Sequence, residues 1–211
     1  MQEQKIRFPS GQLELEGLYC GGQAEKGVVV THPHPLYGGD MFSPVVEAVV
    51  FAYHRLGFAT LRFNFRGAGN SKGAHDGGVG ERADVAAAID WLMGQGVKQI
   101  HLSGYSFGAW VNAMAAQDRL PAQRMTMVAP PVAFIDFADG IRLPTLSAVV
   151  AGSRDEFAPP GLIRPVLDRW NPGARLEVID GADHFFFGDL GEVTRRLVGV
   201  IDVPLSPGGW L

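Results

Sequence analysis

Cysteine is almost absent from this sequence, whose only one is Cys20. A single cysteine cannot form a disulfide within the chain, and no CxxC pattern surrounds Cys20, so we interpret it as a packed residue rather than a nucleophile. The first seven residues are mostly polar and lack the apolar core of a secretory signal. Both absences favour a cytoplasmic protein.

Long apolar runs and clusters of basic residues are also missing. The longest apolar stretches, such as residues 48–53, are far shorter than the ~20 residues of a membrane-spanning helix. The 18 lysines and arginines are outnumbered by 22 acidic residues, which gives a net charge of −4. These features argue against nucleic acids and membranes as partners. With 211 residues, no internal repeat and no linker, the chain is expected to form a single domain over residues 1–211.

Glycine, by contrast, is abundant at 28 of 211 residues. Its short clusters separate apolar runs, which is typical of tight turns in a packed domain. The patterns predict an opening hairpin within residues 5–20, strands at 28–30, 59–65, 100–103, 125–128, 145–151 and 176–179, and helices at about 44–56, 81–92, 107–117, 162–170 and 193–201. Glu81, Arg82 and Asp90 are assigned to the exposed side of the second helix. Strands alternating with helices indicate an α/β fold with a mostly parallel sheet, in which ligands bind at the carboxyl ends of the strands.

One motif lies between a predicted strand and a predicted helix. Residues 104–108 read Gly-Tyr-Ser-Phe-Gly, the G-x-S-x-G pattern in the strand–turn–helix context of a nucleophile elbow. Glycines are needed at Gly104 and Gly108 because larger side chains would collide with neighbouring strands at a strained turn. The motif predicts that Ser106 is a nucleophile held at a helix N-terminus. The alternative interpretation is a structural turn serine.

A serine hydroxyl needs a base that is oriented by a carboxylate. Asp155 and His184 each follow a predicted strand, and the order Ser, Asp, His is that of the α/β-hydrolase fold. We therefore assign Ser106 as nucleophile, His184 as general base and then acid, and Asp155 as the group that orients the imidazole. Glu156 and Asp183 are alternative carboxylates, although a residue next to His184 would have difficulty turning back to its ring.

The developing oxyanion needs two hydrogen-bond donors. The backbone N–H of Phe107 is the first, and the second should come from the loop at residues 31–39, after the strand at 28–30. Prolines 33 and 35 cannot donate, so His34 N–H is the leading candidate and Leu36 N–H the second.

The same loop contains an H-x-H pair, His32 and His34, that could bind a metal with Asp40. No third histidine lies at ligand spacing, so we predict no metal and no cofactor. A G-x-G at Gly67 and Gly69 lacks the third glycine of a dinucleotide site. The preceding Arg66 is interpreted as a partner of a carboxylate within the fold, with contact to an acidic substrate as the alternative.

Four segments together resemble the small bacterial α/β-superfamily hydrolases related to dienelactone hydrolase. They are residues 32–39 (HPHPLYGG), 62–67 (RFNFRG), 104–108 (GYSFG) and 181–186 (GADHFF). The resemblance covers nearly the whole chain and implies an eight-stranded core without a cap domain, a triad of Ser106, His184 and Asp155, and esterase-like activity. Dienelactone hydrolase itself uses a cysteine nucleophile, so Ser106 favours esters or thioesters over lactones.

The segment between two late strands is too short to form a lid. Residues 129–144 number only sixteen, which predicts an open site lined by Leu36, Tyr37, Phe107, Phe157 and Phe185. Of these, Tyr37 and Phe185 are the expected substrate-binding residues, and short or medium acyl groups are the expected substrates.

The sequence thus predicts a serine hydrolase acting on small-molecule esters or thioesters. The alternatives are a non-catalytic binding module on a hydrolase fold and a metal-assisted hydrolase. A monomer or a homodimer is expected, with the tail at residues 204–211 docked on its own domain or on a second copy.

Overall fold

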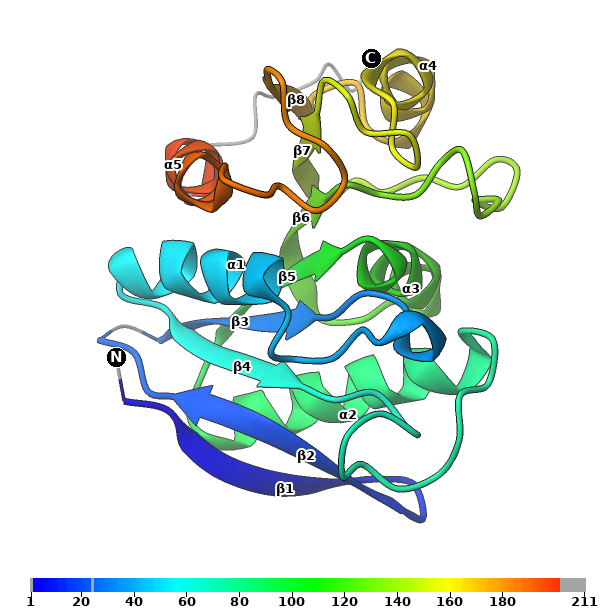
Figure 1. Ribbon diagram of the computed structural model, residues 1–211. Helices are drawn as coiled ribbons and strands as arrows, with labels where there is room; N and C mark the ends of the chain where they lie inside the picture. The colour runs from blue at the N-terminus through cyan, green and yellow to red at the C-terminus, as the bar shows by residue number, and fades with distance from the viewer. Residues whose placement is uncertain (1, 24, 202–211) are drawn as a thin grey trace, which may run out of the picture.

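An eight-stranded sheet organises the computed structural model, which describes residues 2–23 and 25–201 (Figure 1). The strands are β1 (Gln4–Ser10), β2 (Leu13–Cys20), β3 (Lys26–Thr31), β4 (Ala59–Phe63), β5 (Gln99–Tyr105), β6 (Ala122–Val128), β7 (Leu146–Gly152) and β8 (Arg175–Ile179). Their spatial order is β1-β2-β4-β3-β5-β6-β7-β8. The hairpin β1–β2 joins β4 antiparallel, and β3 to β8 are parallel. The predicted α/β class is confirmed. The tail at 204–211 lies outside the described residues.

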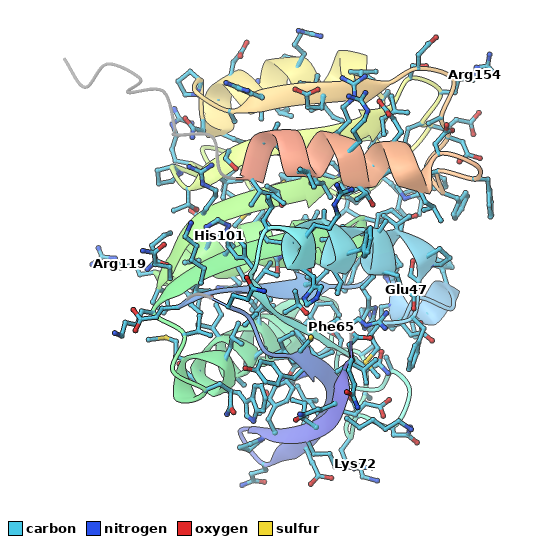
Figure 2. The ribbon with its side chains drawn as sticks, turned by 90° about the vertical axis from the view of Figure 1, so that its left-hand side faces the viewer. Glu47, Phe65, Lys72, His101, Arg119 and Arg154 are labelled. Carbon is cyan, nitrogen blue, oxygen red and sulfur yellow. The ribbon has the colours of Figure 1, made fainter. Side chains whose placement is uncertain are left out.

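Helices cover both faces of the sheet. They are α1 (Pro44–Arg55), α2 (Val79–Gly94), α3 (Phe107–Ala115), α4 (Pro160–Trp170) and α5 (Leu190–Ile201), with short 3-10 turns η1 (Pro35–Tyr37) and η2 (Ala116–Asp118). Figure 2 shows α1 and α5 side by side on one face, and Figure 1 shows α2, α3 and α4 on the other. No helix in the described part of the chain is long and apolar enough to cross a bilayer.

The central strands are buried along their length because helices pack on both of their faces. Every residue of β4 and β7 is buried, whereas the edge strands β1 and β8 keep exposed positions. This is why β3 and β7 appear in the sequence as largely continuous apolar runs rather than as alternating patterns.

Strands β3 to β8 run in the same direction, so the loops after them lie at one end of the molecule and the loops before them at the other. Figure 2 shows Arg154, which follows β7, at one end and Arg119, which precedes β6, at the other.

The connection from β6 to β7 forms no cap. Residues 129–144, all of which the structure describes, contain turns but no helix and no strand. The predicted absence of a lid is therefore confirmed.

One expectation about helix α2 is wrong. Glu81 is fully buried rather than on the exposed side, while Asp90 is exposed as predicted. The Glu81 carboxylate accepts hydrogen bonds from the N–H groups of Asp76 (2.9 Å) and Gly78 (2.8 Å), and it lies 2.9 Å from His75 Nδ1. Gly78 is the N-cap of α2, so the Glu81 carboxylate caps the start of the helix and also holds the preceding loop at Asp76, and these hydrogen bonds offset the loss of water around the charge.

A buried carboxylate ties the β1–β2 hairpin to the rest of the fold. Asp84 accepts hydrogen bonds from the Arg66 guanidinium (2.7 and 3.0 Å), from the Arg66 N–H (3.0 Å) and from the Ser10 hydroxyl (2.7 Å). The Asp84 side chain is fully buried. Arg66 therefore has the structural role that the sequence favoured.

Replacing this carboxylate should destabilise the protein strongly. Asp84→Ala leaves the Arg66 guanidinium and the Ser10 hydroxyl without their partner, so we expect the free energy of unfolding to fall by about 3–5 kcal/mol. The control Ser10→Ala removes one hydrogen bond and should cost about 1 kcal/mol. Urea unfolding monitored by circular dichroism measures both. Equal losses in the two variants would contradict this role for Asp84.

Candidate active site

Ser106 occupies a strained turn between β5 and α3. Its backbone has φ 53° and ψ −118°, a conformation that residues other than glycine rarely adopt. A Cβ at Gly104 would lie 2.6 Å from the Ala109 nitrogen, and one at Gly108 would lie 2.6 Å from Thr31 Oγ1. Both glycines are therefore required, as predicted, although only Gly108 meets a neighbouring strand. Gly104 faces the first turn of α3, and Gly108 faces the end of β3 and the loop that follows.

The structure brings Ser106, His184 and Asp155 together. Ser106 Oγ lies 3.0 Å from His184 Nε2, and His184 Nδ1 lies 2.9 and 3.0 Å from the two Asp155 oxygens. Each residue is carried by a loop at the carboxyl end of a parallel strand, which is β5, β7 or β8. With the ring proton on Nδ1, Nε2 accepts the hydrogen bond from the serine hydroxyl.

The Asp155 carboxylate is fixed by its own loop. Asp155 Oδ1 accepts hydrogen bonds from the N–H groups of Phe157 (2.9 Å) and Ala158 (2.7 Å), and the side chain is fully buried. The alternatives lie elsewhere: Glu156 is exposed, and Asp183 Oδ1 accepts from the N–H of Phe185. Among the carboxylates in the described residues, Asp155 is the one that hydrogen-bonds to the His184 ring.

Tyr105 holds the histidine loop, a contact that sequence reasoning missed. Its hydroxyl donates to the His184 carbonyl oxygen (3.0 Å). Burial raises the pKa of the Tyr105 phenol, so that it remains a donor. The loops after β7 and β8 also meet directly, since Arg154 N–H donates to the Ala182 carbonyl (2.9 Å). The only signal available was the position of Tyr105 inside the G-x-S-x-G motif.

The predicted oxyanion donors are not equivalent. Leu36 N–H already donates to His34 Nδ1 (3.3 Å). Within the described residues, the N–H groups of Phe107 and His34 have no such partner. The ring centroids of His34 and Phe107 are 4.6 Å apart, which places the two residues side by side.

The Phe107 side chain is buried at 2% exposure, so the expectation that it lines the open site is wrong: it packs in the core instead.

Exposed apolar side chains flank the Ser106–His184 pair. Tyr37 is 76% exposed and contacts the His34 ring, with 4.9 Å between centroids. Phe185 is 51% exposed, and its centroid lies 5.6 Å from that of His184. Phe157 approaches the same ring at 4.8 Å. These contacts place the expected substrate-binding residues, Tyr37 and Phe185, at the rim of the site.

The two histidines of the H-x-H pair point in different directions. His32 is fully buried, with Nδ1 2.6 Å from the Pro33 carbonyl oxygen and Nε2 3.0 Å from the Phe65 nitrogen. Both of its ring nitrogens are therefore engaged by the backbone. The His34 ring instead packs against Phe107 and against His75, whose centroid is 4.8 Å away. His32 therefore has no ring nitrogen left to bind a metal, which argues against the metal-binding alternative.

Comparison with known proteins agrees with this architecture. The family model described as X-Pro dipeptidyl-peptidase (S15 family) matches residues 17–152. An uncharacterized protein of Rickettsia prowazekii is 32% identical over 205 residues, which cover 92% of this chain and 86% of that protein. Two solved structures are also similar. An alpha-beta serine hydrolase homologue from Coxiella burnetii has a TM-score of 0.83 and 34% identity, covering 94% of this chain and 96% of that one.

The second structure is XC6422 from Xanthomonas campestris, described as a serine hydrolase without a lid. It has a TM-score of 0.81 and 29% identity, and the match covers 97% of this chain and 98% of that one. The sheet order, the absence of a cap and the elbow at Ser106 agree with these similarities. The chain therefore belongs to the S15 family within the α/β-hydrolase superfamily, and it is similar to the serine hydrolases that lack a lid.

Proposed function

We propose that this protein hydrolyses carboxylic esters or thioesters of short to medium acyl groups through an acyl-enzyme on Ser106. The observation that carries the proposal is the hydrogen-bonded chain from Ser106 Oγ through His184 to Asp155, with distances of 3.0 and 2.9 Å. A serine, an imidazole and a buried carboxylate in that order are the groups that acyl transfer requires.

The geometry supports the following reaction. His184 Nε2 takes the proton of Ser106 as Oγ attacks the substrate carbonyl carbon, and Asp155 stabilises the resulting imidazolium. His184 then returns that proton to the departing alkoxide or thiolate as the bond to the leaving group breaks. In the second half, His184 deprotonates a water molecule, which attacks the acyl carbon. As the bond between the acyl carbon and Ser106 Oγ breaks, His184 returns its proton to Oγ, and the carboxylic acid leaves.

The N–H groups of Phe107 and His34 serve as the oxyanion donors in this proposal. Phe107 is the first residue of α3, so its N–H has no acceptor within that helix and lies at the positive end of the helix dipole. His34 is preferred over Leu36 because the Leu36 N–H is already bonded to the His34 ring. Two donors aimed at the developing charge supply stabilisation that the ground-state carbonyl does not need.

The side chains at the rim favour an uncharged acyl group. Tyr37, Phe157 and Phe185 offer apolar contact around the Ser106–His184 pair. Phe134 extends this surface at 5.6 Å from Phe157, and it is 60% exposed. Without a lid, little of a substrate is enclosed, so selectivity among acyl groups should be weak.

Replacement of the nucleophile tests the proposal. Ser106→Ala should lower kcat on p-nitrophenyl acetate and butyrate about a thousandfold or more, because no acyl-enzyme can form. The control Ser43→Ala should retain full activity, since the Ser43 side chain makes no hydrogen bond as the cap of α1. An X-Pro p-nitroanilide measured in parallel distinguishes the peptidase alternative. Full ester hydrolysis by Ser106→Ala would refute the mechanism, and substrate binding without turnover by the wild type would favour a binding module.

A second pair of variants tests the His34 amide. His34 has φ −61°, which suits proline, so His34→Pro removes the N–H with little change in this angle. His34→Ala is the matched control, because it removes the imidazole and keeps the N–H. We expect kcat of His34→Pro to be about a hundredfold below that of His34→Ala, the usual loss for one oxyanion donor. Equal kcat values in the two folded variants would exclude this amide as a donor.

A further inference from the structure

The His32 ring connects the loop after β3 to the chain leaving β4. Its Nε2 lies 3.0 Å from the backbone nitrogen of Phe65, and the ring is fully buried. A backbone N–H can only donate, so Nε2 must be the acceptor and carries no proton. In the neutral ring the single proton then resides on Nδ1.

That proton has one acceptor, the carbonyl oxygen of Pro33, which lies 2.6 Å from Nδ1. The Pro33 carbonyl and the His34 N–H belong to the same peptide unit. No cis peptide bond occurs in the described residues, and in a trans peptide the C=O and N–H point in opposite directions within one plane. Fixing the carbonyl therefore fixes the direction of the N–H.

We propose that His32 is a positioning residue whose hydrogen bond to Pro33 orients the His34 N–H toward the oxyanion. This inference rests on the proposed function, because it requires an oxyanion at Ser106. A hydrogen bond to the carbonyl also polarises the peptide, which strengthens the N–H as a donor. The ring thus acts on the reaction through the backbone, without touching the substrate.

Neighbouring contacts hold the next part of the loop. The carbonyl oxygen of His34 accepts hydrogen bonds from the N–H groups of Tyr37 (3.1 Å) and Gly39 (3.0 Å). A Cβ at Gly39 would lie 2.3 Å from the Pro33 oxygen, so only glycine allows the loop to fold back this closely. His32 and Gly39 together leave the peptide between Pro33 and His34 little freedom to rotate.

Burial keeps the His32 ring in the state that this role needs. It lowers the pKa of His32 to about 4, because a charged imidazolium would lose its hydration in the core. The ring therefore stays neutral near pH 7. Protonation would also place an Nε2 hydrogen against the Phe65 N–H, which would break the link to β4.

Substitution of His32 by asparagine or by glutamine distinguishes the roles of its two ring nitrogens. In His32→Asn the side-chain nitrogen matches the position of Nδ1 and can still donate to Pro33. In His32→Gln the longer side chain can accept from Phe65 N–H, but it leaves Pro33 without its donor. We expect kcat on p-nitrophenyl butyrate to fall roughly ten- to hundredfold in His32→Gln, with KM changed less than about twofold, because the oxyanion develops only in the transition state.

The variant His32→Asn keeps the donor to the Pro33 carbonyl and should therefore avoid that loss of kcat. His32→Asn is expected to keep kcat within about threefold of the wild type. A purely structural histidine would instead make the two variants equal in kcat, or would change only their melting temperatures, and either result would overturn the proposal. Circular dichroism and thermal melting establish that each variant is folded before the kinetics are compared.

A double-mutant cycle identifies the amide through which His32 acts. In the His34→Pro background there is no N–H to orient, so adding His32→Gln should lower kcat by less than about twofold. A full and independent ten- to hundredfold loss in that background would contradict the proposal. If Ser106→Ala retains activity, the proposed function itself is wrong, whereas loss of activity in Ser106→Ala with unchanged kcat in His32→Gln overturns the positioning role alone.

The wild-type protein offers a test that needs no substitution. In ¹⁵N-labelled protein at pH 7, long-range ¹H–¹⁵N correlation spectra report which ring nitrogen carries the proton. We expect His32 to be neutral with the proton on Nδ1. A proton on Nε2 would exclude donation to Pro33 and would overturn the proposal even if the variants failed to fold.

Discussion

The close approach of helix α3 to the loop after β3 is the constraint on which the site depends. It occurs at Gly108, where a Cβ would lie 2.6–2.7 Å from atoms of Thr31 and His32. Because the backbones can approach this closely, the strained turn at Ser106 lies beside the loop that carries His34. The nucleophile turn and the oxyanion loop are thus brought together by a close backbone approach, and the buried His32 ring holds the Pro33 carbonyl within that loop. Such contacts suit a reaction that requires fixed donors before charge develops.

The parallel sheet brings the remaining groups to the same edge. Strands β5, β7 and β8 are parallel and end at the same edge of the sheet, so the loops after them bring Ser106, Asp155 and His184 together from distant parts of the sequence. Hydrogen bonds hold these loops in place, including the one from the Tyr105 hydroxyl to the His184 carbonyl oxygen. No cap lies between β6 and β7, and among the described residues the rim includes exposed side chains of η1 and of the loop after β8, such as Tyr37 and Phe185. The fold therefore fixes the acyl-transfer groups more firmly than it defines a substrate.

Most of the fold could be predicted from the sequence because apolar runs such as those of β3 and β7 alternate with helical patterns and glycines mark the turns. The sequence also shows that Ser106, Asp155 and His184 each follow a predicted strand in the order Ser, Asp, His, although it does not show their contacts. Glu81 was misassigned because helical periodicity does not register a carboxylate drawn inward by N-terminal N–H groups. The hydrogen bonds of His32 could not be predicted either, since they depend on how close the chain after β4 comes in three dimensions.

The central claim is that Ser106 is an activated nucleophile, and the family match at residues 17–152 ends before Asp155 and His184. Intact-mass measurement after treatment with a fluorophosphonate, followed by peptide mapping, tests this claim directly. The account predicts a single adduct, located on Ser106, and much slower labelling of His184→Asn because the base is missing. A folded wild-type protein that forms no adduct, or one whose adduct lies on another residue, would contradict it.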